Sequence, residues 1–149
     1  MSRWQVQLGA EELNRVLAEA FPRSERSMGP VQAVSPGRIS LVYPYSPAML
    51  RPGGSISGPT MMSLADTAGY VIVMAHAGVE LMALTSSLTI NFLRPARPGD
   101  LHADAELLSL GRRNAVCDVR IWTEAPDRPC AQATVTYARA AAVAGVTEG

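Results

Sequence analysis

The stretch from Gly53 to Val79 carries one carboxylate, Asp66, among residues that are mostly apolar or small. At helical spacing Asp66 shares one face with Pro59, Met62, Tyr70 and Val73. A carboxylate on a largely apolar face is costly unless it has a partner or a use. One use is to take a proton from water as a general base, or to attack a carbonyl carbon as a nucleophile. The alternative is an aspartate that points to solvent or bonds a neighbouring backbone group.

The start of the same helix is a second place where chemistry could occur. Pro59 is typical of a first helical turn, with Ser57 or Gly58 as the N-cap. A helix N-terminus leaves backbone N–H groups free and carries a partial positive charge, and Gly58 would let a ligand approach closely. Ser57 is better explained as an N-cap than as a nucleophile, because neither His76 nor His102 stands at a spacing that would activate it.

Asp66 and the helix start are both positioned by one long helix. It is predicted from about residue 58 to 76, with Gly78 as its stop. Before it, the apolar spacing predicts a shorter helix over about 9–21. Residues 23–30 and 44–57 are expected to be loops, with a short hairpin between them. After the long helix the apolar period changes to two, which predicts a meander of four strands.

This layout is α+β. The sheet must bury one face, and the long helix is the only element apolar enough to cover it. We therefore expect a strongly curved antiparallel sheet wrapped around a central helix. In the first strand after that helix, strict alternation puts Leu88, Ile90 and Phe92 on one face and Thr85 and Asn91 on the other.

The length of 149 residues suits one domain over residues 1–149, with a tail frayed from about residue 140. The formal net charge of +0 gives no broad field for nucleic acid or a membrane surface. The two cysteines lack metal-type spacing, so no metal is expected. The longest apolar run is too short to span a bilayer and no secretory segment precedes it, which favours a cytoplasmic protein.

Four segments together resemble the hotdog-fold acyl-CoA thioesterases, most of all the phenylacetate-pathway branch, over about residues 45–140. They are GGSISGPTMMSLADTAGY, TSSLTINFLRPARPGDL, LLSLGRRNAVCDVRIW and CAQATVTYARA. The resemblance implies a hotdog fold that hydrolyses an acyl thioester to a free acid and a thiol. It implies no cofactor, with coenzyme A present only as part of the substrate. Ser57-Gly58-Pro59 stands where the family has His-Gly-Gly, and Arg51 stands where it has Asn or Gln.

Residue by residue, the resemblance implies that Asp66 is the base, that Gly58 donates to the developing oxyanion, and that Thr85 positions the water. Arg51 and Ser57 would be polar neighbours in the substrate site. The remaining substrate-binding candidates are Asn91, Arg94, Arg112 and Arg113. The three arginines could meet the phosphates of coenzyme A, or they could be solvated turn charges.

Gly58 and Asp66 are eight residues apart, so in one helix they lie about 12 Å apart along the axis. One thioester carbon cannot lie near both. A two-fold homodimer with antiparallel central helices would bring Gly58 of one chain beside Asp66 of the other. The resemblance implies the same composite sites in a homodimer, and whether the dimers pair further into a tetramer stays open. The alternative is a non-catalytic acyl-CoA-binding or regulatory module; a dehydratase is disfavoured, because no His–acid pair is found near the helix.

Overall fold

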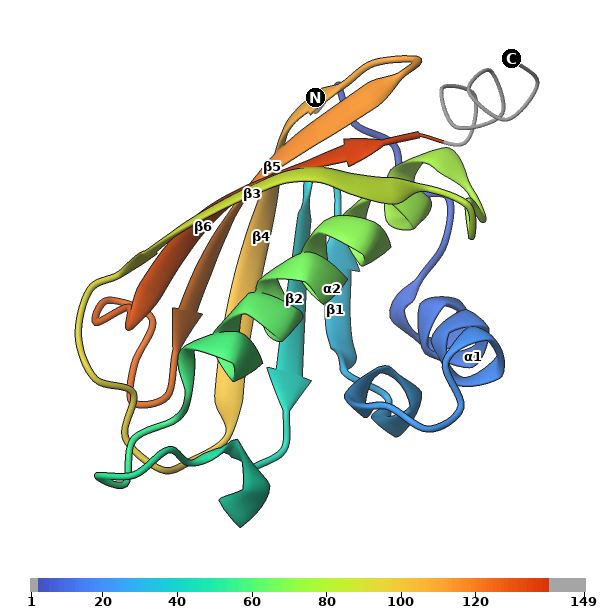
Figure 1. Cartoon of the computed structure of the whole chain (residues 1–149). Helices are drawn as coiled ribbons and strands as arrows, with labels where there is room; N and C mark the ends of the chain where they lie inside the picture. The colour runs from blue at the N-terminus through green and yellow to red at the C-terminus, as the bar shows by residue number, and fades with distance from the viewer. Residues whose placement is uncertain (1–2, 140–149) are drawn as a thin grey trace.

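The long helix is the axis of the fold (Figure 1). The computed structural model describes residues 3–139. In it, helix α2 spans Gly58–Ala77, begins after Ser57 as the N-cap and ends at Gly78, whose φ of +93° favours glycine. These bounds confirm the helix prediction to within one residue. From Thr67 to His76 every residue of α2 is buried, whereas part of its first half remains open to solvent.

Six antiparallel strands curve around α2, which lies across the inner face of the sheet (Figure 1). The strands described are β1 (Val31–Ser35), β2 (Arg38–Tyr43), β3 (Leu84–Phe92), β4 (Leu101–Leu110), β5 (Asn114–Trp122) and β6 (Ala131–Ala138). Helix α1 (Ala10–Ala20) packs beside β1 and lies within the predicted range. The predicted curved sheet around a central helix is therefore confirmed. Within residues 3–139, no helix is both long and apolar enough to cross a membrane.

The order of the strands corrects the predicted meander. The sheet runs β1-β2-β4-β5-β6-β3, so β3 pairs with β6 at the far edge and not with β4, the next strand along the chain. The connection over residues 93–100 carries the chain from that edge back to the middle of the sheet. Alternation identifies a strand but says nothing about its neighbour, and this connection is long enough to cross two strands. Only β4, β5 and β6 form a meander.

Two segments predicted as loops contain short 3₁₀-helices. One spans Glu25–Met28, with the Ser24 side chain accepting a hydrogen bond from the Arg26 N–H, and the other spans Pro47–Met49. Neither is long enough to show a period in the sequence, which is why periodicity did not find them. The first matters for the site below, because it carries Arg26. The predicted frayed tail lies almost wholly outside the described residues.

Candidate active site

Asp66 receives hydrogen bonds from three other elements of the fold. The Thr85 hydroxyl on β3 and the Tyr137 hydroxyl on β6 both donate to Oδ1, the latter at 2.7 Å. Arg26 Nη2 donates to Oδ2 at 3.1 Å and forms an ion pair with it. The Asp66 side chain is nevertheless 31% exposed in the single chain. The carboxylate is thus fixed in direction while one side of it stays accessible.

A β-bulge places Thr85 beside Asp66. Thr85 lies opposite Tyr137, but Ser87 is already opposite Thr136, so Ser86 is an extra residue in β3. The bulge puts Thr85 on the inner face that Leu88 and Ile90 also use. Strict alternation, which assigned Thr85 to the opposite face, is wrong at this point. Thr85 holds the carboxylate directly, and its oxygen can still accept a hydrogen bond from water.

Tyr137 is a residue of this cluster that sequence reasoning missed. Its ring is buried, and its hydroxyl lies 2.9 Å from the backbone oxygen of Asp66 as well as bonding the carboxylate. Burial raises the pKa of the Tyr137 phenol above its ordinary range, and the Asp66 carboxylate raises it further. The phenol therefore stays a neutral donor. The sequence carries one signal for Tyr137. Alternation in the last strand turns this aromatic hydroxyl inward, where a hydroxyl needs a hydrogen-bond partner.

The packing of Tyr137 depends on Gly69, at the place where α2 crosses β6. A Cβ on Gly69 would lie 2.8 Å from Val135 Cγ1 and 2.9 Å from Tyr137 Cε2. We predict that Gly69→Ala lowers the free energy of unfolding by about 1–3 kcal/mol, because the helix or the ring must shift. Urea denaturation measures this change. Gly99→Ala is the matched control, because its Cβ would make only an ordinary contact with Thr123; equal losses in the two variants would contradict the packing argument.

At the start of α2 the structure leaves one backbone donor available. The Ser57 hydroxyl accepts from the Thr60 N–H at 3.3 Å and lies 2.8 Å from the Thr60 hydroxyl, which confirms its role as the N-cap. Pro59 has no N–H. The Gly58 N–H meets no acceptor within residues 3–139. A Cβ on Gly58 would lie 3.2 Å from Phe92 Cζ, so this ring packs closely over the helix start.

Two of the predicted substrate-binding residues lie apart from this cluster. Arg51 is exposed at a turn closed by its own N–H and the Ser55 oxygen at 2.9 Å, and its side chain forms no hydrogen bond or ion pair with the part of the chain described. Asn91 donates to Gln132 Oε1 at 3.1 Å on the outer face of the sheet. Neither side chain is hydrogen-bonded to Asp66 or Gly58.

The predicted arginines fall into two separate groups. Arg94 lines a cavity of about 310 Å³ beyond the end of β3. Its other lining residues are Pro95, Arg97, Thr123, Glu124, Arg128 and Cys130. The Thr123 hydroxyl there is buried and has no hydrogen-bond partner among residues 3–139. Arg112 and Arg113 are exposed in the turn before β5, about 30 Å away at the other end of that nine-residue strand.

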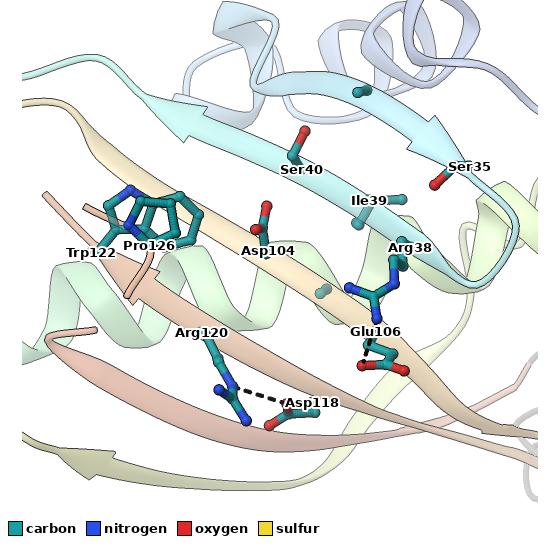
Figure 2. Close-up of a pocket in the computed structure, with 12 residues that line it drawn as sticks. Ser35, Arg38, Ile39, Ser40, Asp104, Glu106, Asp118, Arg120, Trp122 and Pro126 are labelled. Atoms are coloured by element: carbon teal, nitrogen blue, oxygen red, sulfur yellow. Dashed lines mark ion pairs between the residues drawn. The ribbon is translucent and has the colours of Figure 1, made fainter. Parts of the chain in front are cut away.

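A groove of about 440 Å³ lies on the outer face of the sheet, away from α2 (Figure 2). Two ion pairs line it, the exposed pair Arg38–Glu106 at 3.4 Å and the partly exposed pair Arg120–Asp118 at 3.5 Å. Exposed pairs of this kind contribute little to stability. The groove shares no residue with the Asp66 cluster. We therefore assign the chemistry to the inner face, where the carboxylate and the helix start lie.

The sequence pattern of the Thioesterase superfamily matches residues 53–130, which is just over half of the chain. The matched segment includes Gly58, Asp66 and Thr85. The chain belongs to the thioesterase superfamily. The solved structure of a candidate thioesterase from Silicibacter sp. TM1040 is 34% identical, with a TM-score of 0.81 over 91% of this chain and 94% of that one. Because that neighbour shares the curved sheet and central helix, the predicted hotdog fold of this thioesterase-superfamily protein is confirmed.

Two further relatives of this thioesterase-superfamily protein differ in what they share with it. The PaaI protein from the phenylacetic acid degradation operon of E. coli is 24% identical, with a TM-score of 0.69 over 87% of this chain and 95% of that one, which shows likeness of fold. A candidate esterase from Halobacterium salinarum is 33% identical over 100 residues, 64% of this chain and 66% of that relative. The matched region thus spans just under two thirds of that relative's length.

Proposed function

We propose that the protein is an acyl-CoA thioesterase that hydrolyses its substrate at a composite site between two chains. The observation that carries this proposal is the Asp66 cluster, in which three donors from three elements fix a carboxylate on an otherwise largely apolar helix face. Membership of the thioesterase superfamily supports the class of reaction. A carboxylate held in one direction is what a general base needs, because the attacking water must be bound at a defined place.

The reaction uses Gly58 of one chain and Asp66 of the other. The free Gly58 N–H donates to the thioester carbonyl oxygen, where negative charge develops; one such donor is typically worth about 10²–10³ in rate. Asp66 takes a proton from water as the water oxygen bonds to the carbonyl carbon, a step worth about 10²–10⁴. The tetrahedral intermediate then releases the thiolate. The proton on Asp66 passes to the sulfur, which leaves a free acid and coenzyme A.

The proposed dimer rests on surfaces that the single chain leaves open. Strand β3 forms an edge of the sheet with most of its residues exposed on both faces, and such an edge is usually covered. Large apolar side chains are exposed beside it: Met62 (41% exposed), Leu84, Phe92 and Leu93. Antiparallel pairing of two β3 edges about a two-fold axis would cover these residues. It would also set the two α2 helices side by side in opposite directions.

We place the phosphates of coenzyme A in the Arg94 cavity. The Ile56 N–H donates to the Ala96 oxygen at 2.9 Å, which ties the loop after β3 to the residues just before α2. Arg94 therefore lies at the Gly58 end of the helix. Arg97 and Arg128 line the same cavity, and guanidinium groups bind phosphate well. Arg112 and Arg113 lie at the opposite end of their own chain, so only those of the partner chain could approach this site.

The proposal predicts release of free thiol from acyl-CoA substrates. The measurement is a panel of aromatic and aliphatic acyl-CoA compounds, including phenylacetyl-CoA, with the thiol detected by a thiol-reactive dye. Light scattering should give twice or four times the 15.8 kDa mass of one chain. If no compound releases thiol while a non-hydrolysable acyl-CoA binds tightly by calorimetry, the protein is an acyl-CoA-binding or regulatory module, and the hydrolase is ruled out.

A further inference from the structure

Arg26 is built into the Asp66 cluster from outside the matched family region. It comes from the 3₁₀-helix Glu25–Met28, and its side chain is only 16% exposed. Its Nη2 donates to Asp66 Oδ2 at 3.1 Å, and its Nε donates to the Thr67 hydroxyl at 2.8 Å. The Thr67 hydroxyl in turn lies 2.7 Å from the Tyr43 hydroxyl. The guanidinium is therefore anchored on α2 and, through Thr67, on β2 independently of the carboxylate.

Two aromatic rings fix the guanidinium from its other side. Its central carbon lies 4.7 Å from the centroid of the Phe21 ring and 5.2 Å from that of Tyr70. The two rings pack edge to face, with centroids 5.6 Å apart. Cation–π contacts of this kind hold an arginine in place when it is partly desolvated. Arg26 is thus pre-organised, and Asp66 meets a cation that cannot easily move away.

The hydrogen bonds that each carboxylate oxygen of Asp66 accepts show which oxygen is free to react. A carboxylate oxygen accepts two hydrogen bonds well. Oδ1 already accepts from Thr85 and Tyr137, so it is saturated. Oδ2 accepts from Arg26 alone among the described residues and keeps one lone pair. Oδ2 is therefore the oxygen that can take a proton from water. Arg26 is the group that sets the direction of this oxygen.

We propose that Arg26 is a positioning residue for hydrolysis, which holds the Asp66 carboxylate so that the free lone pair of Oδ2 points toward the attacking water. This inference rests on the proposed function. It names a residue that the motif of the superfamily does not cover, because the matched segment begins at residue 53. The role belongs to the charge and the planar shape of arginine together.

Among residues 3–139, Arg26 is the only charged group that forms an ion pair with the Asp66 carboxylate. Tyr137 on β6 faces the carboxylate, and Tyr70 faces the guanidinium. Tyr43 bonds the Thr67 hydroxyl, which also accepts from Arg26. Burial raises the pKa of all three phenols, so they stay neutral through the working range. Glu25, next to Arg26 in the chain, is exposed. Arg26 is therefore the charged partner that sets the direction of Oδ2.

The test is the measurement of kcat and KM for Arg26→Gln and Arg26→Lys. In Arg26→Gln, kcat should fall about tenfold with KM within about twofold, because Oδ2 is no longer held. Arg26→Lys should also lose kcat with KM nearly unchanged, because an ammonium lacks the planar fork.

The matched control is Arg23→Gln, three residues earlier, which removes an exposed arginine with no hydrogen bond or ion pair inside residues 3–139. It should behave as wild type. Wild-type kcat in Arg26→Gln would overturn the inference; if that variant does not fold, wild-type kcat in Arg26→Lys would do the same. Wild type and Asp66→Asn are measured in the same assay. If wild type releases no thiol, the proposed function and this inference are both wrong. If wild type is active and Asp66→Asn is inactive, only the role of Arg26 is in question.

Discussion

Asp66→Asn lowers kcat for thioester hydrolysis by at least about 100-fold, at the lower end of what general-base catalysis contributes. The amide has the size of the carboxylate, and its oxygen can still accept from Thr85 and Tyr137. It cannot take a proton from water near neutral pH. The remaining turnover should come from the helix-end donor and from substrate binding, which the substitution leaves in place.

The same substitution has a structural consequence that can be measured. With its oxygen toward Thr85, the amide turns its NH₂ group toward Arg26 Nη2, so two donors face each other where an ion pair stood. We expect a small loss of thermal stability with the dimer intact. Asp104→Asn is the matched control, because Asp104 lies in the outer groove and shares no contact with Asp66. An Asp66→Asn enzyme as fast as wild type would show that the carboxylate is not the base.

Local pattern predicts the elements of this fold, because the long helix carries its own signals. Ser57 and Gly78 mark its ends in the sequence, and both mark them in the structure. Alternation likewise finds every strand of the sheet. It does not find that β3 pairs with β6, because the partner is chosen by packing around α2 and not by the strand's own residues. The bulge at Ser86 is invisible for the same reason, and it decides which face Thr85 uses.

The site was predictable only within the family motif, which covers Gly58, Asp66 and Thr85. Gly58 and Asp66 lie on one helix, so the family motif indicates both. Arg26 comes from four residues of 3₁₀-helix without a period, and Tyr137 comes from the last strand. They meet Asp66 only after the sheet has curved around the helix. A contact made by long-range packing leaves no trace in local spacing, which is why two of the three residues that donate to the carboxylate were not found.

The second large effect is expected at the Gly58 amide. Proline at this position removes the N–H, and the extended backbone of Ser57, with φ −70° and ψ 150°, is the conformation favoured before proline. Because Pro59 follows, the substitution is made together with Pro59→Ala. We predict that Gly58→Pro in this background lowers kcat by about 10²–10³, the value of one oxyanion donor.

Two controls separate the amide from the added side chain. Pro59→Ala alone should turn over as wild type, because the Pro59 ring is exposed and carries no polar group. Gly58→Ala with Pro59→Ala adds the same Cβ against the Phe92 ring and keeps the N–H. The ratio of kcat between the Ala and Pro variants therefore measures the hydrogen bond itself. Equal rates in these two variants would show that Gly58 serves packing against Phe92 and not the reaction.

Combining the two defects in one dimer tests the composite site directly. The Gly58→Pro chain retains Asp66, and the Asp66→Asn chain retains the Gly58 amide, so each homodimer lacks one half of both sites. In a mixed dimer with antiparallel helices, one site receives both defects and the other receives none. Co-expression in equal amounts makes about half of the dimers mixed, so activity should recover to about a quarter of the wild-type value. If instead the mixture stays as slow as either variant alone, the amide and the carboxylate act within one chain, and the antiparallel dimer is the wrong arrangement.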